Sequence, residues 1–162
     1  MKILKLNKIE VAEKVGKFLT STDAFVHIWF PNEKELVIKA VFDSLKDKNH
    51  QYWYAEEDGK IAGAIGVREN HCNNGGYEMD DDYVAVHKDY RRRGIASKLL
   101  DEIESYVISH KGRYIHILTC DIDSYKPARA FYESRGYKKV AEMPNYYNVG
   151  EGRIDYYKEI KC

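Results

Sequence analysis

Hydrophobic and polar positions follow two different periods along this chain. Four segments repeat apolar residues every three to four positions, as amphipathic helices do, and shorter segments are continuously apolar or alternating, as strands are. The predicted helices cover residues 9–20, 32–46, 94–110 and 126–135. The predicted strands cover residues 2–6, 51–57, 60–68, 78–86, 114–120, 137–143 and 154–160. The order βααβββαβαββ predicts an α/β (α+β) fold with helices packed on a central sheet.

Turn and capping residues mark the ends of several predicted elements. Asn32 is expected to cap the second helix, with the Glu35 side chain reaching back to it. Asp58-Gly59 predicts a two-residue hairpin turn, and Gly136 predicts the end of the last helix. Residues 144–152 are polar and rich in tyrosine, which predicts a loop.

The segment 82–100 combines a strand, a basic turn and a helix. Three arginines, Arg91, Arg92 and Arg93, stand directly before Gly94, Ile95 and Ala96. A helix N-terminus presents unpaired N–H groups that suit a phosphate, and small residues let the ligand approach the backbone. The alternative is a solvated basic loop, since most helix N-termini bind no anion. The spacing matches neither a P-loop nor the three-glycine dinucleotide motif.

Two motifs in this half of the chain resemble one known family. Arg91-x-x-Gly94-x-Ala96 resembles the Q/R-x-x-G-x-G/A signature of GCN5-related N-acetyltransferases (GNAT), and Ala128-x-x-Phe131-Tyr132-Glu133-x-x-Gly136-Tyr137 resembles a second motif of that family. The two motifs occur in the family's order and spacing. The resemblance implies a mixed, mostly antiparallel sheet of about seven strands, flanked by helices on both faces.

The same resemblance implies acetyl-CoA as the cofactor and assigns residues to it. The expected cofactor contacts come from Val84, Ala85, Val86, Arg91, Arg92, Arg93, Gly94, Ile95 and Ala96. Tyr125 stands where the family usually has an Asn that bonds the cofactor, so it is a further, atypical contact. Tyr132 stands at the family's general-acid position, where a phenol donates to the CoA sulfur.

The general base is the least defined part of the predicted site. Asp80 falls where histone-acetylating members carry a Glu base, and it is our first candidate; a solvated strand end is an equal alternative. Glu78 is a lesser candidate. Cys120 stands where ribosomal-protein alanine acetylators carry their catalytic Glu, so that base is absent here. A water chain ending on one of these carboxylates is a further alternative.

Composition limits the partners and the compartment. The 162 residues carry 26 basic and 26 acidic side chains, so the formal net charge of zero gives no support to nucleic-acid or membrane-surface binding. This length predicts a single domain, 1–162, and no apolar run is long enough to span a membrane. The three cysteines show no metal-ligand spacing, and a reduced, cytoplasmic setting is expected. A homodimer is compatible with the sequence.

The predicted function is transfer of an acetyl group to a primary amine by direct attack. The alternative is a non-catalytic acyl-CoA-binding or sensing module with the same fold. Acidic residues near position 80 and aromatic residues at Phe25, Trp29, Tyr146 and Tyr147 favour a small cationic amine or a peptide N-terminus as acceptor. His27 is interpreted as a partly buried histidine with a structural partner.

Overall fold

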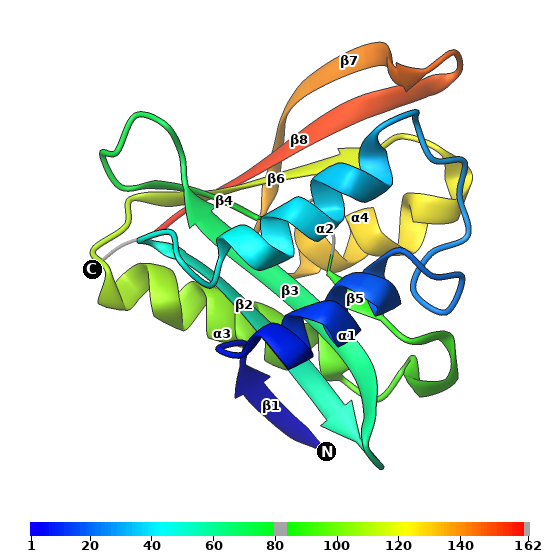
Figure 1. The fold of residues 1–162 in the computed structure, drawn as a ribbon. Coiled ribbons are helices and arrows are strands. Elements are labelled where there is room, and N and C mark those ends of the chain that lie inside the picture. The colour runs from blue at the N-terminus through cyan, green and yellow to red at the C-terminus, as the bar shows by residue number, and fades with distance from the viewer. Residues whose placement is uncertain (80–83, 161–162) are drawn as a thin grey trace.

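The computed structural model describes residues 1–79 and 84–160, and it has one sheet at its centre (Figure 1). The strands are β1 (Lys2–Lys5), β2 (His50–Glu57), β3 (Lys60–Glu69), β4 (Gly76–Met79), β5 (Ala85–Val86), β6 (Tyr114–Cys120), β7 (Lys138–Asn148) and β8 (Glu151–Glu159). The helices are α1 (Ile9–Leu19), α2 (Glu33–Asp43), α3 (Ile95–Ser109) and α4 (Lys126–Ser134), with short 3-10 turns at Lys88–Tyr90 and Asp123–Tyr125. The predicted fold class is confirmed, with eight strands instead of about seven.

The sheet is antiparallel except at one pair. Its order is β1-β2-β3-β4-β6-β8-β7, and β5 pairs with β3 beside this path. Only β4 and β6 pair in parallel within the described part of the chain, because α3 lies between them in sequence and crosses over the sheet. The predicted turn at Asp58-Gly59 joins β2 to β3, and both residues have the positive φ angles, 52° and 74°, that such a turn requires.

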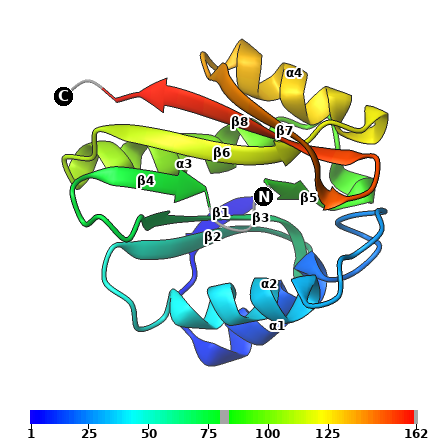
Figure 2. The same cartoon turned by 90° about the horizontal axis from the view of Figure 1, so that it is seen from above.

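Helices cover both faces of the sheet (Figures 1 and 2). On one face, α1 and α2 pack their buried side chains, such as Val15 and Val41, against Tyr52 and Tyr54 of β2. On the other face, α3 and α4 cover the rest of the sheet, with Leu99 and Tyr132 among the buried contacts. Both sheet faces therefore need apolar residues, which explains the continuous apolar runs of the central strands. Among the described helices, none is long and apolar enough to cross a membrane.

The strand predicted at residues 78–86 is two strands. Val67 of β3 pairs with Met79 of β4, whereas Ala64 of β3 pairs with Ala85 of β5, so the register on β3 shifts by three residues between the two strands. Both pieces are apolar and extended, and sequence pattern alone does not separate them. In the described part of the chain β5 pairs with β3 alone, while β4 also pairs with β6. The sheet therefore opens between β5 and β6.

Two local predictions were wrong. Residues 144–152 are not a loop: β7 continues to Asn148 and β8 begins at Glu151, and the register between the two strands shifts between Met143 and Asn148, as at a bulge. Asn32 occupies the N-cap position of α2, but its side chain makes no capping bond. The Glu33 carboxylate instead accepts the Phe30 N–H at 3.1 Å, which turns Glu33 into the interior.

Candidate active site

The turn between β5 and α3 presents backbone N–H groups to solvent. Gly94 caps α3 with φ 78°, a left-handed conformation that costs glycine little. The N–H groups of residues 95–97, in the first turn of α3, have no acceptor within the helix. A side chain at Gly94 would meet no atom within 4 Å, so the space in front of this turn is open. These donors and the helix dipole together suit an anion such as a pyrophosphate.

The three arginines of this turn have different surroundings. The Arg91 guanidinium donates to the Ala24 carbonyl at 3.2 Å and to the Val86 carbonyl at 3.4 Å, so it ties the turn to the loop after α1. The Arg93 guanidinium lies over the Tyr90 ring at 5.1 Å and 3.9 Å from the Glu57 carboxylate. Arg91 and Arg92 border the open space, whereas Arg93 is directed away from it.

A cleft of about 620 Å³ lies beside this turn, where the sheet opens. Of the predicted site residues, it is lined by Val84, Val86, Arg91, Arg92, Gly94, Ile95, Ala96, Tyr125 and Tyr132. Ala85 is fully buried in the core that faces α1, which the alternation of a strand explains, and with Arg93 it does not line the cleft. Asp80 lies outside the described residues. The structure thus brings two distant motifs to one cleft.

Tyr132 reaches the cleft from α4. It is 2% exposed, and its ring packs against Tyr137 and Tyr156 with centroids 6.3 and 6.0 Å away. These contacts hold the ring on the buried side of the helix while one edge borders the cleft. The hydroxyl of a phenol is a hydrogen-bond donor, so Tyr132 can donate to a group bound in the cleft.

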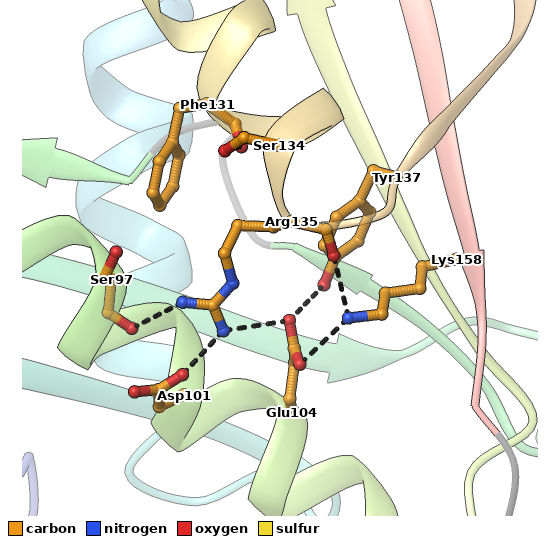
Figure 3. Close-up of polar contacts among 8 residues, drawn as sticks. All are labelled: Ser97, Asp101, Glu104, Phe131, Ser134, Arg135, Tyr137 and Lys158. Atoms are coloured by element: carbon orange, nitrogen blue, oxygen red, sulfur yellow. Dashed lines mark hydrogen bonds and ion pairs between the residues drawn. The ribbon is translucent and has the colours of Figure 1, made fainter.

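A cluster of charged side chains fixes the end of α4 that carries Tyr132 (Figure 3). The Arg135 guanidinium donates to the Ser97 carbonyl at 3.2 Å, to Asp101 at 2.6 Å and to Glu104 at 3.3 Å. These partners all belong to α3, the helix whose N-terminus forms the anion-binding turn. The cluster therefore holds α4 at a constant position relative to that turn.

A second, smaller hollow of about 20 Å³ adjoins the cleft. Its lining includes two acidic residues, Glu33 and Glu151, and two aromatic residues, Phe30 and Tyr147, whose rings are stacked with centroids 6.3 Å apart. Thr119 and Tyr125 line both the hollow and the cleft, so they mark the place where the two spaces meet.

Two residues of the hollow bear on the search for a general base. Glu33 was not among the candidates from sequence, and the structure buries it, with 5% exposed. Cys120 is also buried there, and burial raises the pKa of its thiol, so it stays protonated at neutral pH and is no substitute for a carboxylate base.

The cleft, the open sheet and the basic turn before α3 define a class of fold that can hold an anionic cofactor. The sequence profile of the acetyltransferase (GNAT) family matches residues 19–137. The chain therefore belongs to the GNAT family of N-acetyltransferases, whose members take the acetyl group from acetyl-CoA.

One curated relative resembles part of this chain in sequence, and solved structures share its fold. Residues of this chain are 36% identical over 76 positions to N-alpha-acetyltransferase 60 of Drosophila melanogaster, a match that covers 43% of this chain and 26% of that protein. The match thus spans about a quarter of the length of that curated relative. A GNAT-family crystal structure from Desulfovibrio desulfuricans superposes with a TM-score of 0.84 at 24% identity, covering 99% of both chains. An aminoglycoside 6'-N-acetyltransferase complexed with coenzyme A gives a TM-score of 0.78 at 20% identity, covering 100% of this chain and 98% of that one.

The residues present fit a CoA molecule. Its pyrophosphate is an anion that needs several donors, and the first turn of α3 with Arg92 supplies them. Its pantetheine arm is a chain of amides, and β5 has a free edge beside the cleft in the described part of the chain. The cleft volume of about 620 Å³ is within the range of cofactor sites, roughly 300–1,000 Å³.

Proposed function

We propose that this protein is an acetyl-CoA-dependent N-acetyltransferase that acts on a primary amine by direct attack. The observation that carries the proposal is the meeting of two spaces at Thr119 and Tyr125. One space suits an anionic cofactor, and the other is lined by carboxylates and aromatic rings. A thioester held at the junction would be within reach of an amine that enters from the smaller hollow.

The chemistry needs a proton acceptor for the amine and a donor for the departing thiolate. Tyr132 is proposed as the acid, because its ring is fixed by packing and it borders the cleft. For the base, Asp80 stays the prediction from sequence, and the hydrogen-bonded side chains of the smaller hollow offer an alternative among the described residues. Tyr125 is proposed to contact the cofactor through its ring, in place of the usual Asn. No covalent intermediate on the protein is required, since bound reactants need only be held in the correct orientation.

The acceptor is proposed to be a small cationic amine or a peptide N-terminus. Glu33 and Glu151 attract a cation to the hollow, and the stacked rings of Phe30 and Tyr147 can add cation–π attraction. The relatives named above act, by their names, on N-alpha amines and on aminoglycosides, which are both amines. An anionic acceptor such as a sugar phosphate would be repelled by the two carboxylates.

A reducing, cytoplasmic setting belongs to the same proposal. Cys72 and Cys120 are free thiols, and an enzyme that releases a thiol product is compatible with a reduced compartment. Whether the chain acts alone or as a homodimer stays a prediction to be measured in solution.

An acceptor screen tests the proposed function. The purified chain is mixed with acetyl-CoA and one amine at a time, and the released thiol is measured with a thiol reagent. The panel contains spermidine, lysine, kanamycin and a tetrapeptide with a free N-terminus, and each amine is also mixed with acetyl-CoA without the protein as a control. We expect thiol release with at least one cationic amine. Binding of acetyl-CoA by calorimetry without any thiol release would instead favour the non-catalytic acyl-CoA-binding module.

A further inference from the structure

Three side chains of the smaller hollow form a hydrogen-bonded row. The Tyr125 hydroxyl lies 2.8 Å from His27 Nδ1, and His27 Nε2 lies 3.2 Å from Glu33 Oε2. The other carboxylate oxygen, Oε1, accepts the Phe30 N–H at 3.1 Å. The side chains of His27 and Glu33 are only 7% and 6% exposed. The row joins three segments: the loop between α1 and α2, the start of α2 and the 3-10 turn before α4.

The partners in the row determine the direction of each hydrogen bond. An ionised carboxylate only accepts, so His27 Nε2–H donates to Glu33. In the neutral imidazole the other nitrogen is then an acceptor, and Tyr125 Oη–H donates to Nδ1. The backbone N–H of Phe30 holds the Glu33 carboxylate in place. The arrangement therefore resembles, in physical terms, a hydroxyl that is activated by a histidine which a carboxylate orients.

The hydroxyl end of the row lies at the chemically important position. Tyr125 lines both the cofactor cleft and the smaller hollow, whereas His27 and Glu33 line the hollow alone. The His27 ring is packed against aromatic rings, with Trp29 4.3 Å and Phe25 5.7 Å away between centroids. This packing restricts the orientation of the imidazole. A proton accepted at Tyr125 thus has a defined path away from the junction.

We propose that Tyr125, His27 and Glu33 form a proton relay that removes the proton from the attacking amine. The inference rests on the proposed function. The amine nitrogen attacks the thioester carbon and becomes positively charged. Its proton passes to Tyr125 Oη while the Tyr125 proton passes to His27 Nδ1, and Glu33 stabilises the resulting imidazolium.

The rest of the reaction balances the protons. The carbon–sulfur bond breaks, and the CoA thiolate takes a proton from Tyr132, the proposed acid. The imidazolium then releases its proton to solvent, and Tyr132 regains one. The net change is one amide and one thiol from one amine and one thioester. Tyr125 is the catalytic residue of the row, while His27 and Glu33 act through it.

The relay predicts a pH dependence that belongs to His27. The rate should fall at low pH, because a protonated imidazole cannot accept the Tyr125 proton. Among the described residues, the charged or titratable groups near His27 are Glu33 and Tyr125, with Cys120 and Glu151 in the same hollow. Glu33→Gln removes the charge that stabilises the imidazolium formed during the relay but keeps a hydrogen-bonding oxygen, so it should lower the rate.

The experiment measures kcat/KM against pH with the best amine of the panel for wild type, Tyr125→Phe, His27→Gln and Glu33→Gln. Removing one acid or base typically costs about 10²–10⁴ in rate. We expect losses of this size for the first two variants and disappearance of the acid limb in His27→Gln. Calorimetry should show that all three variants bind acetyl-CoA within a few-fold of wild type.

A matched control is available in a second histidine–carboxylate pair. His50, at the start of β2, lies 3.9 Å from Asp47 and is buried like His27, and neither residue lines the cleft or the hollow. His50→Gln should leave the rate and the pH profile unchanged. A similar loss in this variant would point to a general effect on folding and would overturn the specific role of His27.

Other outcomes separate the relay from the function on which it rests. If wild type is active and His27→Gln keeps its rate and acid limb, while Asp80→Asn loses them, the relay is wrong and the enzyme assignment stands. If wild type binds acetyl-CoA but releases no thiol with any amine, the relay and the proposed acetyltransferase function are both contradicted. A nitrogen-15 spectrum of His27 adds an activity-independent readout: protonation at Nδ1 in the neutral ring would overturn the relay.

Discussion

Tyr132 differs from phenylalanine by a single hydroxyl, which makes its proposed role directly testable. We predict that Tyr132→Phe lowers kcat by about 10²–10⁴ with little change in acetyl-CoA affinity, because the phenol supplies a proton only when the thiolate departs. Steady-state rates and calorimetry measure the two quantities. The control is Tyr137→Phe, the neighbouring ring, which is buried but does not line the cleft. Unchanged turnover in Tyr132→Phe, with chemistry rate-limiting, would remove this residue from the mechanism.

Substitution of Gly94 tests a second proposed contact, the one between the cofactor pyrophosphate and the start of α3. Its φ of 78° is strained for most side chains by roughly 1–2 kcal/mol, but Asn tolerates it. We predict that Gly94→Trp abolishes acetyl-CoA binding, because the indole would fill the open space before α3. Gly94→Asn should keep the fold and weaken binding less. Calorimetry on both folded variants measures the affinity for acetyl-CoA. Unchanged affinity in Gly94→Trp would show that the pyrophosphate binds elsewhere.

At the scale of whole elements, the site depends on how α4 is attached to α3. Glu104 of α3 accepts hydrogen bonds from Arg135, from the Tyr137 hydroxyl at 3.3 Å and from Lys158 at 3.2 Å (Figure 3). Lys158 also donates to the Arg135 carbonyl at 2.9 Å. One carboxylate thus connects α3 with the segment after α4 and with β8. The anion-binding turn and Tyr132 share a single rigid support.

We predict that Glu104→Gln lowers the free energy of unfolding by roughly 1–3 kcal/mol, because it removes the charge from a partly buried group with three donors. Asp101→Asn is the control: its side chain is 65% exposed, so its pairing with Arg135 should contribute less than about 1 kcal/mol. Urea unfolding of both variants measures the difference. Equal destabilisation by the two substitutions would show that Glu104 contributes no more to stability than the exposed Asp101.

At the scale of the whole molecule, the tyrosine-rich core determines stability at high pH. Burial raises the pKa of Tyr77 to about 12. Burial, with the nearby Glu133 carboxylate, raises the pKa of Tyr156 to about 12 as well. Burial also raises the pKa of Tyr137 above its ordinary range. These phenols must stay protonated in the folded protein.

The consequence is a loss of stability in alkali. A phenol ionises near pH 10 in the unfolded chain, and its folded pKa is higher, so its contribution is complete below pH 10 and is lost as pH rises toward 12. We predict a steep decrease in the free energy of unfolding over this interval. Tyr77→Phe should make the decrease shallower. Denaturant unfolding at pH 8, 10 and 11 measures both curves, and parallel curves for the two proteins would contradict the prediction.

Sequence by itself determined most of the elements and predicted most of the residues that line the cleft. Helical and strand periods depend on burial of one face, which each local segment records in its own side chains. The basic turn at Arg91–Ala96 and the phenol at Tyr132 belong to compact motifs, so their neighbours in sequence already indicate their chemistry. This is why most expected cofactor residues do line one cleft, whereas Ala85 and Arg93 do not.

Only the tertiary structure decided how strands pair and which distant residues meet. The register shift between β4 and β5 leaves no mark on the apolar pattern, and the extension of β7 depends on its partner β8 rather than on its own exposed side chains. Tyr125 and His27 lie 98 residues apart, and their contact requires the loop after α1 and the turn before α4 to pack together. A local pattern carries no information on such packing, so His27 could be interpreted in sequence only as a histidine with an unknown partner.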